Sequence, residues 1–359
     1  MRKILTLMLI ISMVAFVFTG CSSAKPTSES GGKNIKLNFA TFWPSEDFQV
    51  ADGHKAWVEE IKNRVEAETP HTIDIVLHPG GSLLGATEIY AGVSDGIADI
   101  GTTAPSYTPG VFPATSAFEL PGLKNDNALV ASLAIQEAFD TYEAIQKEYK
   151  DVKVMHFWAT GPGDIISNKP INTLEDVKGM EIRVAGGSVP VIQALGGTPV
   201  SMSMSEAYLA LDSGIVKGIL GPTDILKGFK IAEVTKNVVK APSLYNIVFV
   251  KVMNQKTWDS LPADVQKIFD EVNAEFVKKY GTLRAEHAIV GLQYAIEKHG
   301  MNVIELSPEE EKKWLDAISN VQDKWATDVS KNGVNGQDVL KKVRELDEKY
   351  SAQYGNEFK

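Results

Sequence analysis

The sequence KGMEIRV at residues 178–184 decides the fold, because it turns at Gly179 and then continues as a short apolar strand. Residues 188–195 follow with helical spacing and end at Gly196 and Gly197, and glycine is a common helix stop. A strand leading into a helix is the repeating unit of α/β proteins with parallel or mixed sheets. Arg183 lies in the middle of this strand, and its planar guanidinium suits bidentate binding of a carboxylate.

The same alternation of strands and helices extends outward in both directions. We predict strands at residues 35–41, 72–78, 97–102, 152–158 and 248–250, and helices at residues 49–68, 88–96, 127–149 and 205–211, the last capped by Ser205. Residues 262–299 have no interior proline and predict one helix of about 50 Å, long enough to lie across two lobes. A capping box that begins at Ser307 opens a tail predicted as two amphipathic helices.

The length of the chain favours two lobes, because single cores stop growing at about 250–300 residues. We predict a two-lobed α/β binding-protein fold with a hinge, a long lobe-spanning helix and a helical C-terminal tail. Lobe I is expected to comprise residues 35–158 plus about 244–284, and lobe II about 159–243 plus 285–359.

The N-terminus reads as a bacterial lipoprotein signal. Arg2 and Lys3 precede an apolar run at residues 4–18, and Gly20 leads into Cys21, the only cysteine of the chain. We expect cleavage before Cys21 and lipid on its thiol, against the alternative of a plain signal peptide with a chance cysteine. Residues 1–21 are then signal and lipobox, residues 22–34 a flexible tether, and the protein is extracytoplasmic and anchored to the membrane.

The charge balance excludes one class of partner. Without Arg2 and Lys3 the 36 basic residues become 34 against 46 acidic ones, which gives the mature chain a formal charge of −12. Binding to nucleic acid needs a basic surface, so we expect no nucleic-acid partner. An anionic ligand would need a local cluster of donors that overcomes the global field.

No catalytic or metal motif is present in the sequence. The six histidines are scattered without zinc spacing, and neither a Gly-x-Ser-x-Gly elbow nor a Walker loop occurs. The glycine-rich residues 80–85 are not followed by Lys-Ser/Thr, so loop geometry explains them better than phosphate binding. We therefore predict a protein that is not an enzyme and that has no cofactor and no metal.

Candidate ligand contacts gather near predicted strand ends, where ligands bind in such sheets. Arg183 could equally form a surface ion pair, and an aromatic residue is more often core than cleft wall. With these alternatives open, the candidates are the cation Arg183, the aromatic residues Trp43, Tyr107, Trp158 and Tyr208, and the hydroxyls Thr160, Ser203 and Thr223.

Several strings in order along the chain carry a family resemblance. They are PGGSLLG at 79–85, GIADIG at 96–101, KGMEIRV at 178–184, ALGGTPV at 194–200 and EAYLALDSGIVKG at 206–218. Together they resemble the substrate-binding subunit of TRAP transporters, in the dicarboxylate-binding (DctP) family. The resemblance implies a cleft that closes on its ligand, delivery to a small and a large membrane subunit driven by an ion gradient, and Arg183 as the carboxylate-binding arginine.

Two departures from the family pattern concern the substrate. Residues 161–164 read GPGD where many members carry a second basic residue, and residues 217–222 read KGILGP where Asp-Gly-x-Glu-Asn-Pro is usual. We therefore expect a small organic acid with one carboxylate and an apolar or aromatic body on Trp43, Trp158 or Tyr107. The alternatives are a binding protein of an ATP-driven importer, a lipoprotein hydrolase and a ligand-sensing partner of a signalling receptor.

Overall fold

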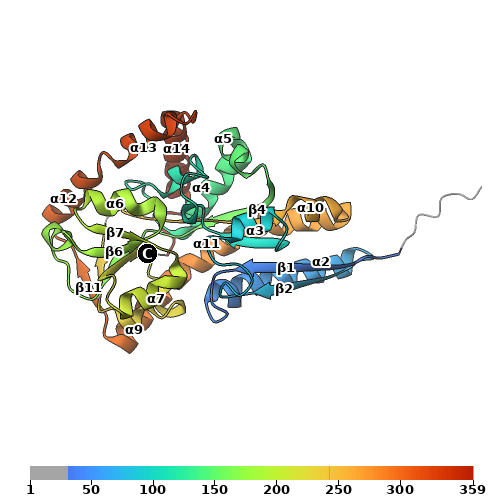
Figure 1. Ribbon diagram of the computed structural model, residues 1–359, viewed down its shortest axis with the longest axis horizontal. Helices are drawn as coiled ribbons and strands as arrows, with labels where there is room; N and C mark the ends of the chain where they lie inside the picture. The colour runs from blue at the N-terminus through green and yellow to red at the C-terminus, as the bar shows by residue number, and fades with distance from the viewer. Residues whose placement is uncertain (1–30, 242, 359) are drawn as a thin grey trace, which may run out of the picture.

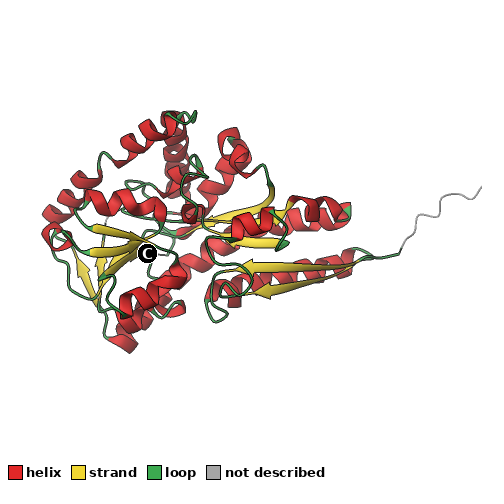
Figure 2. Cartoon of the chain, viewed as in Figure 1, coloured by secondary structure: helices red, strands yellow, loops and turns green. Residues whose placement is uncertain are grey.

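The computed structural model describes residues 31–241 and 243–358, and they form two sheets joined by helices. The strands gather in two separate groups on either side of the molecule (Figure 2). This mixed α/β architecture, with a long central helix and a helical tail, confirms the predicted fold class. Cys21 and the predicted signal segment lie outside the described residues. Within the described ranges, no helix combines the length and the apolar character that a bilayer crossing needs.

Lobe I is built on a five-stranded sheet of order β2-β1-β3-β10-β4. The first three strands in sequence run parallel, whereas β10 is antiparallel to β3 and β4. Its strands are β1 (Asn34–Thr41), β2 (Thr72–His78), β3 (Ile100–Thr103), β4 (Val152–Ala159) and β10 (Val248–Asn254). Its helices are η1 (Gln49–His54), α2 (Lys55–Glu68), α3 (Ile89–Ser94), η2 (Pro105–Tyr107), η3 (Thr115–Glu119), α4 (Ala128–Thr141), α5 (Glu143–Gln146), η4 (Lys147–Tyr149) and α10 (Gln255–Ser260).

Lobe II is built on a six-stranded sheet of order β11-β9-β5-β8-β6-β7. The strands are β5 (Asp164–Ser167), β6 (Glu181–Val184), β7 (Thr198–Ser201), β8 (Gly218–Gly221), β9 (Asn237–Lys240) and β11 (Asn302–Glu305). The short helices between them are η5 (Leu174–Val177), η6 (Gly186–Ser188), α6 (Val189–Ala194), α7 (Met204–Asp212), α8 (Ile225–Gly228) and α9 (Ile231–Val234). The strand that carries Arg183 is thus β6, paired in parallel with β7 and β8.

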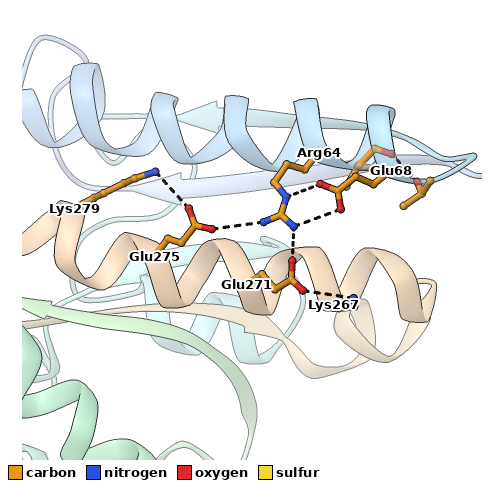
Figure 3. Close-up of polar contacts among 8 residues, drawn as sticks. Arg64, Glu68, Lys267, Glu271, Glu275 and Lys279 are labelled. Carbon is orange, nitrogen blue, oxygen red and sulfur yellow. Dashed lines mark hydrogen bonds and ion pairs between the residues drawn. The ribbon is translucent and has the colours of Figure 1, made fainter.

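The long helix α11 (Ala263–His299) connects the lobes (Figure 1). At 1.5 Å per residue, its 37 residues span roughly 55 Å. In lobe I it packs on α2 and α4, and in lobe II on α8. At the lobe I end, the guanidinium of Arg64 in α2 pairs with Glu271 and Glu275 of α11 as well as with Glu68 of its own helix (Figure 3).

The C-terminal tail differs from the prediction in two respects. It contains three helices instead of two, α12 (Pro308–Ile318), α13 (Val321–Ser330) and α14 (Gly336–Tyr354). We expected all of residues 285–359 to accompany lobe II, but α14 packs against α4 of lobe I. The Asp347 carboxylate of α14 accepts the backbone N–H groups of Lys124 and Asn125, so the last helix is fastened to lobe I.

Two other local predictions were wrong for identifiable reasons. The predicted helix at 127–149 breaks at Tyr142, whose backbone is extended, into α4, α5 and η4. The cap of α7 is Ser203 and not Ser205, because Ser203 and Glu206 form a reciprocal capping box. The spacing of a serine and a glutamate three residues later identifies the helix start better than a single serine does.

Candidate functional site

A cavity lies between the two lobes where the ends of β6, β8 and β10 approach the loop after β1. Its free volume is small, about 20 Å³, because the walls lie close together. Most of its lining is apolar or aromatic, and four charged side chains interrupt that lining. The wall comprises Phe42, Trp43, Asp47, Phe48, Tyr107, Thr160, Arg183, Met204, Gly221, Pro222, Asp224, Ile225, Phe229, Tyr245, Ile247, Phe249 and Arg284.

Arg183 reaches the cavity from β6, and only 2% of it is exposed. Its Nε and Nη2 donate to the backbone carbonyl of Met202 at 3.1 and 2.8 Å, which fixes the plane of the guanidinium. In the part of the chain that the structure describes, no carboxylate lies within 4 Å of its nitrogens. Arg183 is therefore a buried cation, held in place, whose charge no side chain neutralises. This is the arrangement that a carboxylate ligand can complete.

Lobe I contributes an aromatic wall opposite Arg183. Trp43 stacks on Phe42 with 3.9 Å between ring centroids, and Phe249 meets the Trp43 ring edge-on at 4.8 Å. Trp43 and Phe42 are each 2% exposed, so their ring positions are set by packing before any ligand arrives. Such a surface suits a flat apolar body.

Two further predicted residues, Tyr107 and Thr160, line the cavity. The Tyr107 hydroxyl accepts the N–H of Met204 at 3.1 Å, which links lobe I to the first turn of α7 in lobe II. Its ring meets Phe42 edge-on at 5.5 Å. The Thr160 hydroxyl accepts the N–H of Ile247 at 2.9 Å and so joins two of the segments that run between the lobes.

The other four predicted residues lie outside the cavity lining. Trp158 is fully buried behind Trp43, with 6.0 Å between their ring centroids. Ser203 caps α7, the Tyr208 hydroxyl donates to Glu233, and the Thr223 hydroxyl donates to the carbonyl of Ala288. Ser203, Tyr208 and Thr223 thus have structural hydrogen-bond partners, whereas the buried indole N–H of Trp158 has none among the described residues.

Sequence reasoning missed Arg284, a second buried arginine of the cavity. Its Nη2 donates to Asp224 at 2.7 Å and its Nη1 to the side-chain oxygen of Gln49 at 2.9 Å. Burial raises the pKa of Asp224, and the guanidinium of Arg284 opposes that rise. A signal was present, because Arg284 continues the stripe of Phe276 and Tyr280 at four-residue spacing and so had to face inward.

Asp47, in the loop after β1, was also missed. It is 1% exposed, and its Oδ1 accepts the N–H of Gln49 at 2.8 Å. Burial raises the pKa of Asp47 to about 7, against the lowering by that hydrogen bond and by Arg284. No periodic pattern surrounds this loop residue, so nothing in the sequence distinguished it from other loop carboxylates.

Known proteins resemble this chain along most of its length. The family model for bacterial extracellular solute-binding proteins, family 7, matches residues 39–328. A TRAP periplasmic solute-binding protein from Desulfovibrio salexigens is 33% identical, with a TM-score of 0.75 over 90% of this chain and 99% of that one. A TRAP solute-binding protein from Rhodoferax ferrireducens, solved with copurified benzoate, is 27% identical, with a TM-score of 0.82 over 89% and 99% of the two chains.

A third solved structure is a marine metagenome TRAP solute-binding protein specific for aromatic acid ligands, in complex with 3-hydroxybenzoate. It is 28% identical, with a TM-score of 0.82 over 89% of this chain and 99% of that one. The family match covers most of the chain, and the structural matches extend over both lobes. This protein therefore belongs to family 7 of the bacterial extracellular solute-binding proteins and is a TRAP solute-binding protein.

Proposed function

We propose that this protein captures a small monocarboxylate with an apolar or aromatic body and delivers it to the small and large subunits of a TRAP transporter. The observation that carries the proposal is Arg183, a buried cation that has no acidic partner among the described residues and that faces a wall of aromatic rings. The carboxylate binds the guanidinium in lobe II, and the body of the ligand lies against Trp43 and Phe42 in lobe I.

A single carboxylate fits the charges of the cavity better than two do. The other lining arginine, Arg284, is already paired with Asp224 at 2.7 Å. A second ligand carboxylate would have to compete with that bond or approach Asp47. Desolvating an unpaired charge is costly, so the proposed ligand carries one.

The solved relatives support an aromatic body. The Rhodoferax ferrireducens protein holds benzoate, and the marine metagenome protein is specific for aromatic acid ligands. Both are more than 25% identical to this chain and share its two-lobed fold. The aromatic pair of Trp43 and Phe42 supplies the surface on which such a ring can stack.

On the membrane side, we propose that lipid on Cys21 anchors the protein at the extracytoplasmic surface. Residues 22–33 then form the tether between the lipid and β1, which begins at Asn34. Cys21→Ser is expected to release the full-length protein from the membrane fraction, as measured by fractionation and immunoblotting. Full retention of the Cys21→Ser protein in membranes would contradict the anchor.

A thermal-shift screen of the mature protein against organic acids tests the ligand class. Ligand at about one hundred times its Kd stabilises a protein by roughly 2.7 kcal/mol, enough for a clear rise in Tm. Benzoate, 3-hydroxybenzoate and mandelate should raise Tm, and Arg183→Ala should abolish that rise. The matched control is Arg344→Ala, which removes an exposed arginine bonded to Gln322 of α13, away from the cavity lining. Stabilisation by dicarboxylates, sugars or amines without any by monocarboxylates would refute the proposal.

A further inference from the structure

Asp47 is a charged residue of the cavity wall, and a carboxylate bound to Arg183 would not serve as a partner for it. Lobe II covers it, because Gly228 of α8 lies so close that an added Cβ there would be 1.8 Å from Asp47 Oδ2. The backbone N–H of Gln49 donates a hydrogen bond to its Oδ1 at 2.8 Å. Separation of the lobes removes Gly228 and returns this carboxyl group to water. The environment of Asp47 therefore depends on closure.

The charges around the cavity balance before a ligand binds. The four charged lining residues are two arginines, Arg183 and Arg284, and two aspartates, Asp47 and Asp224. An added carboxylate leaves one excess negative charge in a space whose charged lining residues are largely buried. The low dielectric of such a space makes an uncompensated charge costly.

We propose that Asp47 takes up a proton when the cleft closes over its ligand, so that this protein captures an organic acid anion together with one proton. The inference rests on the proposed function and adds a specificity-determining residue to the same site. Protonated Asp47 also becomes a hydrogen-bond donor inside the cavity, which favours ligands that carry an acceptor on the end opposite the carboxylate.

The surroundings of Asp47 support this uptake. Burial is the largest of the influences that together raise its pKa to about 7, and Asp224 and Asp52 contribute to that rise. Arg284 of α11 and the Gln49 N–H act in the opposite direction. The other charged or titratable groups near this seam between the lobes are Glu46, Lys227, Lys230 and His287, which line an adjoining pocket with Asp52 and Asp224.

A zwitterion is the competing occupant, with a cation placed against ionised Asp47. The position of Arg284 disfavours it, because this guanidinium lines the same cavity and interacts with Asp47 electrostatically. A ligand cation beside Asp47 would therefore also face a fixed positive charge. A plain acid with a proton on Asp47 avoids that repulsion.

Titration calorimetry with benzoate, in buffers of different ionisation enthalpy, measures the proton directly. A carboxyl group whose pKa rises from its ordinary value to about 7 on closure takes up about 0.9 proton per ligand at pH 6 and about 0.5 at pH 7. The same linkage makes benzoate affinity fall by about tenfold between pH 6 and pH 8, because the protonated form predominates below pH 7 and is lost above it. Benzoate itself stays ionised over this range.

Variants assign the proton to one residue. Asp47→Asn should bind benzoate with no proton uptake and with an affinity that is constant from pH 6 to pH 8. His287→Gln is the matched control, since this imidazole lines the adjoining pocket at the same seam; this variant should keep the tenfold change. Thermal unfolding confirms that each variant is folded.

Three results would overturn the inference. Benzoate binding without proton uptake leaves Asp47 ionised, and uptake that persists in Asp47→Asn places the proton elsewhere. Binding of glycine betaine that is lost in Asp47→Asn identifies a zwitterion site instead. If no organic acid binds at any pH, the proposed function itself is wrong, and the inference fails with it. Binding of benzoate without proton uptake is a different result, because it contradicts the role of Asp47 and leaves the proposed function standing.

Discussion

Two arginines line the same cavity, and they differ in what holds them. Arg284 of α11 is paired with Asp224 and bonded to Gln49, whereas Arg183 of β6 donates to one backbone carbonyl and has no acidic partner among the described residues. Both side chains are about 2% exposed, so burial does not distinguish them. The difference shows that a buried arginine becomes a ligand site when its charge is left without a partner, and a structural element when it is paired.

The largest effect should follow from breaking the paired arginine. Asp224→Ala leaves the Arg284 guanidinium buried without its partner, and loss of one member of a buried pair costs about 3–5 kcal/mol. The free energy of unfolding, measured by urea denaturation, should fall by that amount. A loss below about 1 kcal/mol would mean that Arg284 is not held by this pair.

The converse experiment removes the unpaired arginine. Arg183→Ala should weaken binding of a monocarboxylate by about 2–4 kcal/mol, or roughly 30- to 1,000-fold in Kd, because the ligand carboxylate loses its buried partner. The unfolding free energy should change much less than in Asp224→Ala. Calorimetry and urea denaturation of the two variants together test the comparison, and a variant that loses stability but keeps affinity would reverse the two roles.

A conservative change sharpens the role of the guanidinium. Arg183→Lys keeps the charge but removes the planar fork and one of the two bonds to the Met202 carbonyl. We expect an affinity about tenfold weaker than that of the native protein and stronger than that of Arg183→Ala. An affinity equal to the native value would show that only the charge matters.

A smaller effect is expected at the contact between the lobes. Tyr107→Phe removes the hydroxyl that accepts the Met204 N–H, so the closed form loses about 1 kcal/mol and the Kd rises by about fivefold. Thr160→Val removes a hydroxyl that joins two segments of the hinge. This variant is the comparison for Tyr107→Phe within the cavity wall. Unchanged affinity in Tyr107→Phe would show that this bond does not contribute to closure.

The smallest effect belongs to an arginine far from the cavity. Arg64→Ala breaks the ion pairs between α2 and α11 shown in Figure 3, whose glutamate partners are about half exposed to solvent. Such pairs contribute little, so stability should fall less than in any variant above and ligand affinity should not change. A change in affinity would link the lobe I end of α11 to the cleft.

The sequence allowed Arg183 to be predicted but not Arg284 or Asp47. Arg183 lies in a strand whose neighbours are apolar, and a cation there must either be paired or face a ligand. Arg284 lies in a helix of 37 residues that we interpreted from its apolar stripe alone. Arg284 follows Tyr280 by four residues and therefore lies on the same face of the helix. Asp47 is defined by the approach of Gly228 from the other lobe, a contact between residues far apart in the chain.

The fold was more predictable than the site. Alternating strands and helices and the uninterrupted run at 262–299 are local patterns, and the structure confirms both. The placement of α14 is not local, because its contact with α4 joins residues more than two hundred positions apart. Likewise, Trp158 was predicted in the cavity wall, but the ring of Trp43 lies in front of it.

The path of the tail has a practical use in sensor design. Glu310 of α12 accepts the Leu174 N–H in lobe II, whereas the side chains of Gln322 and Trp325 in α13 donate to Pro121 and Ser116 in lobe I. The exposed turn at Ser319 and Asn320 therefore joins a helix carried by one lobe to a helix carried by the other. A fluorescent domain inserted in this turn would be strained or relaxed as the cleft closes, and one polypeptide would then report ligand concentration as an optical signal.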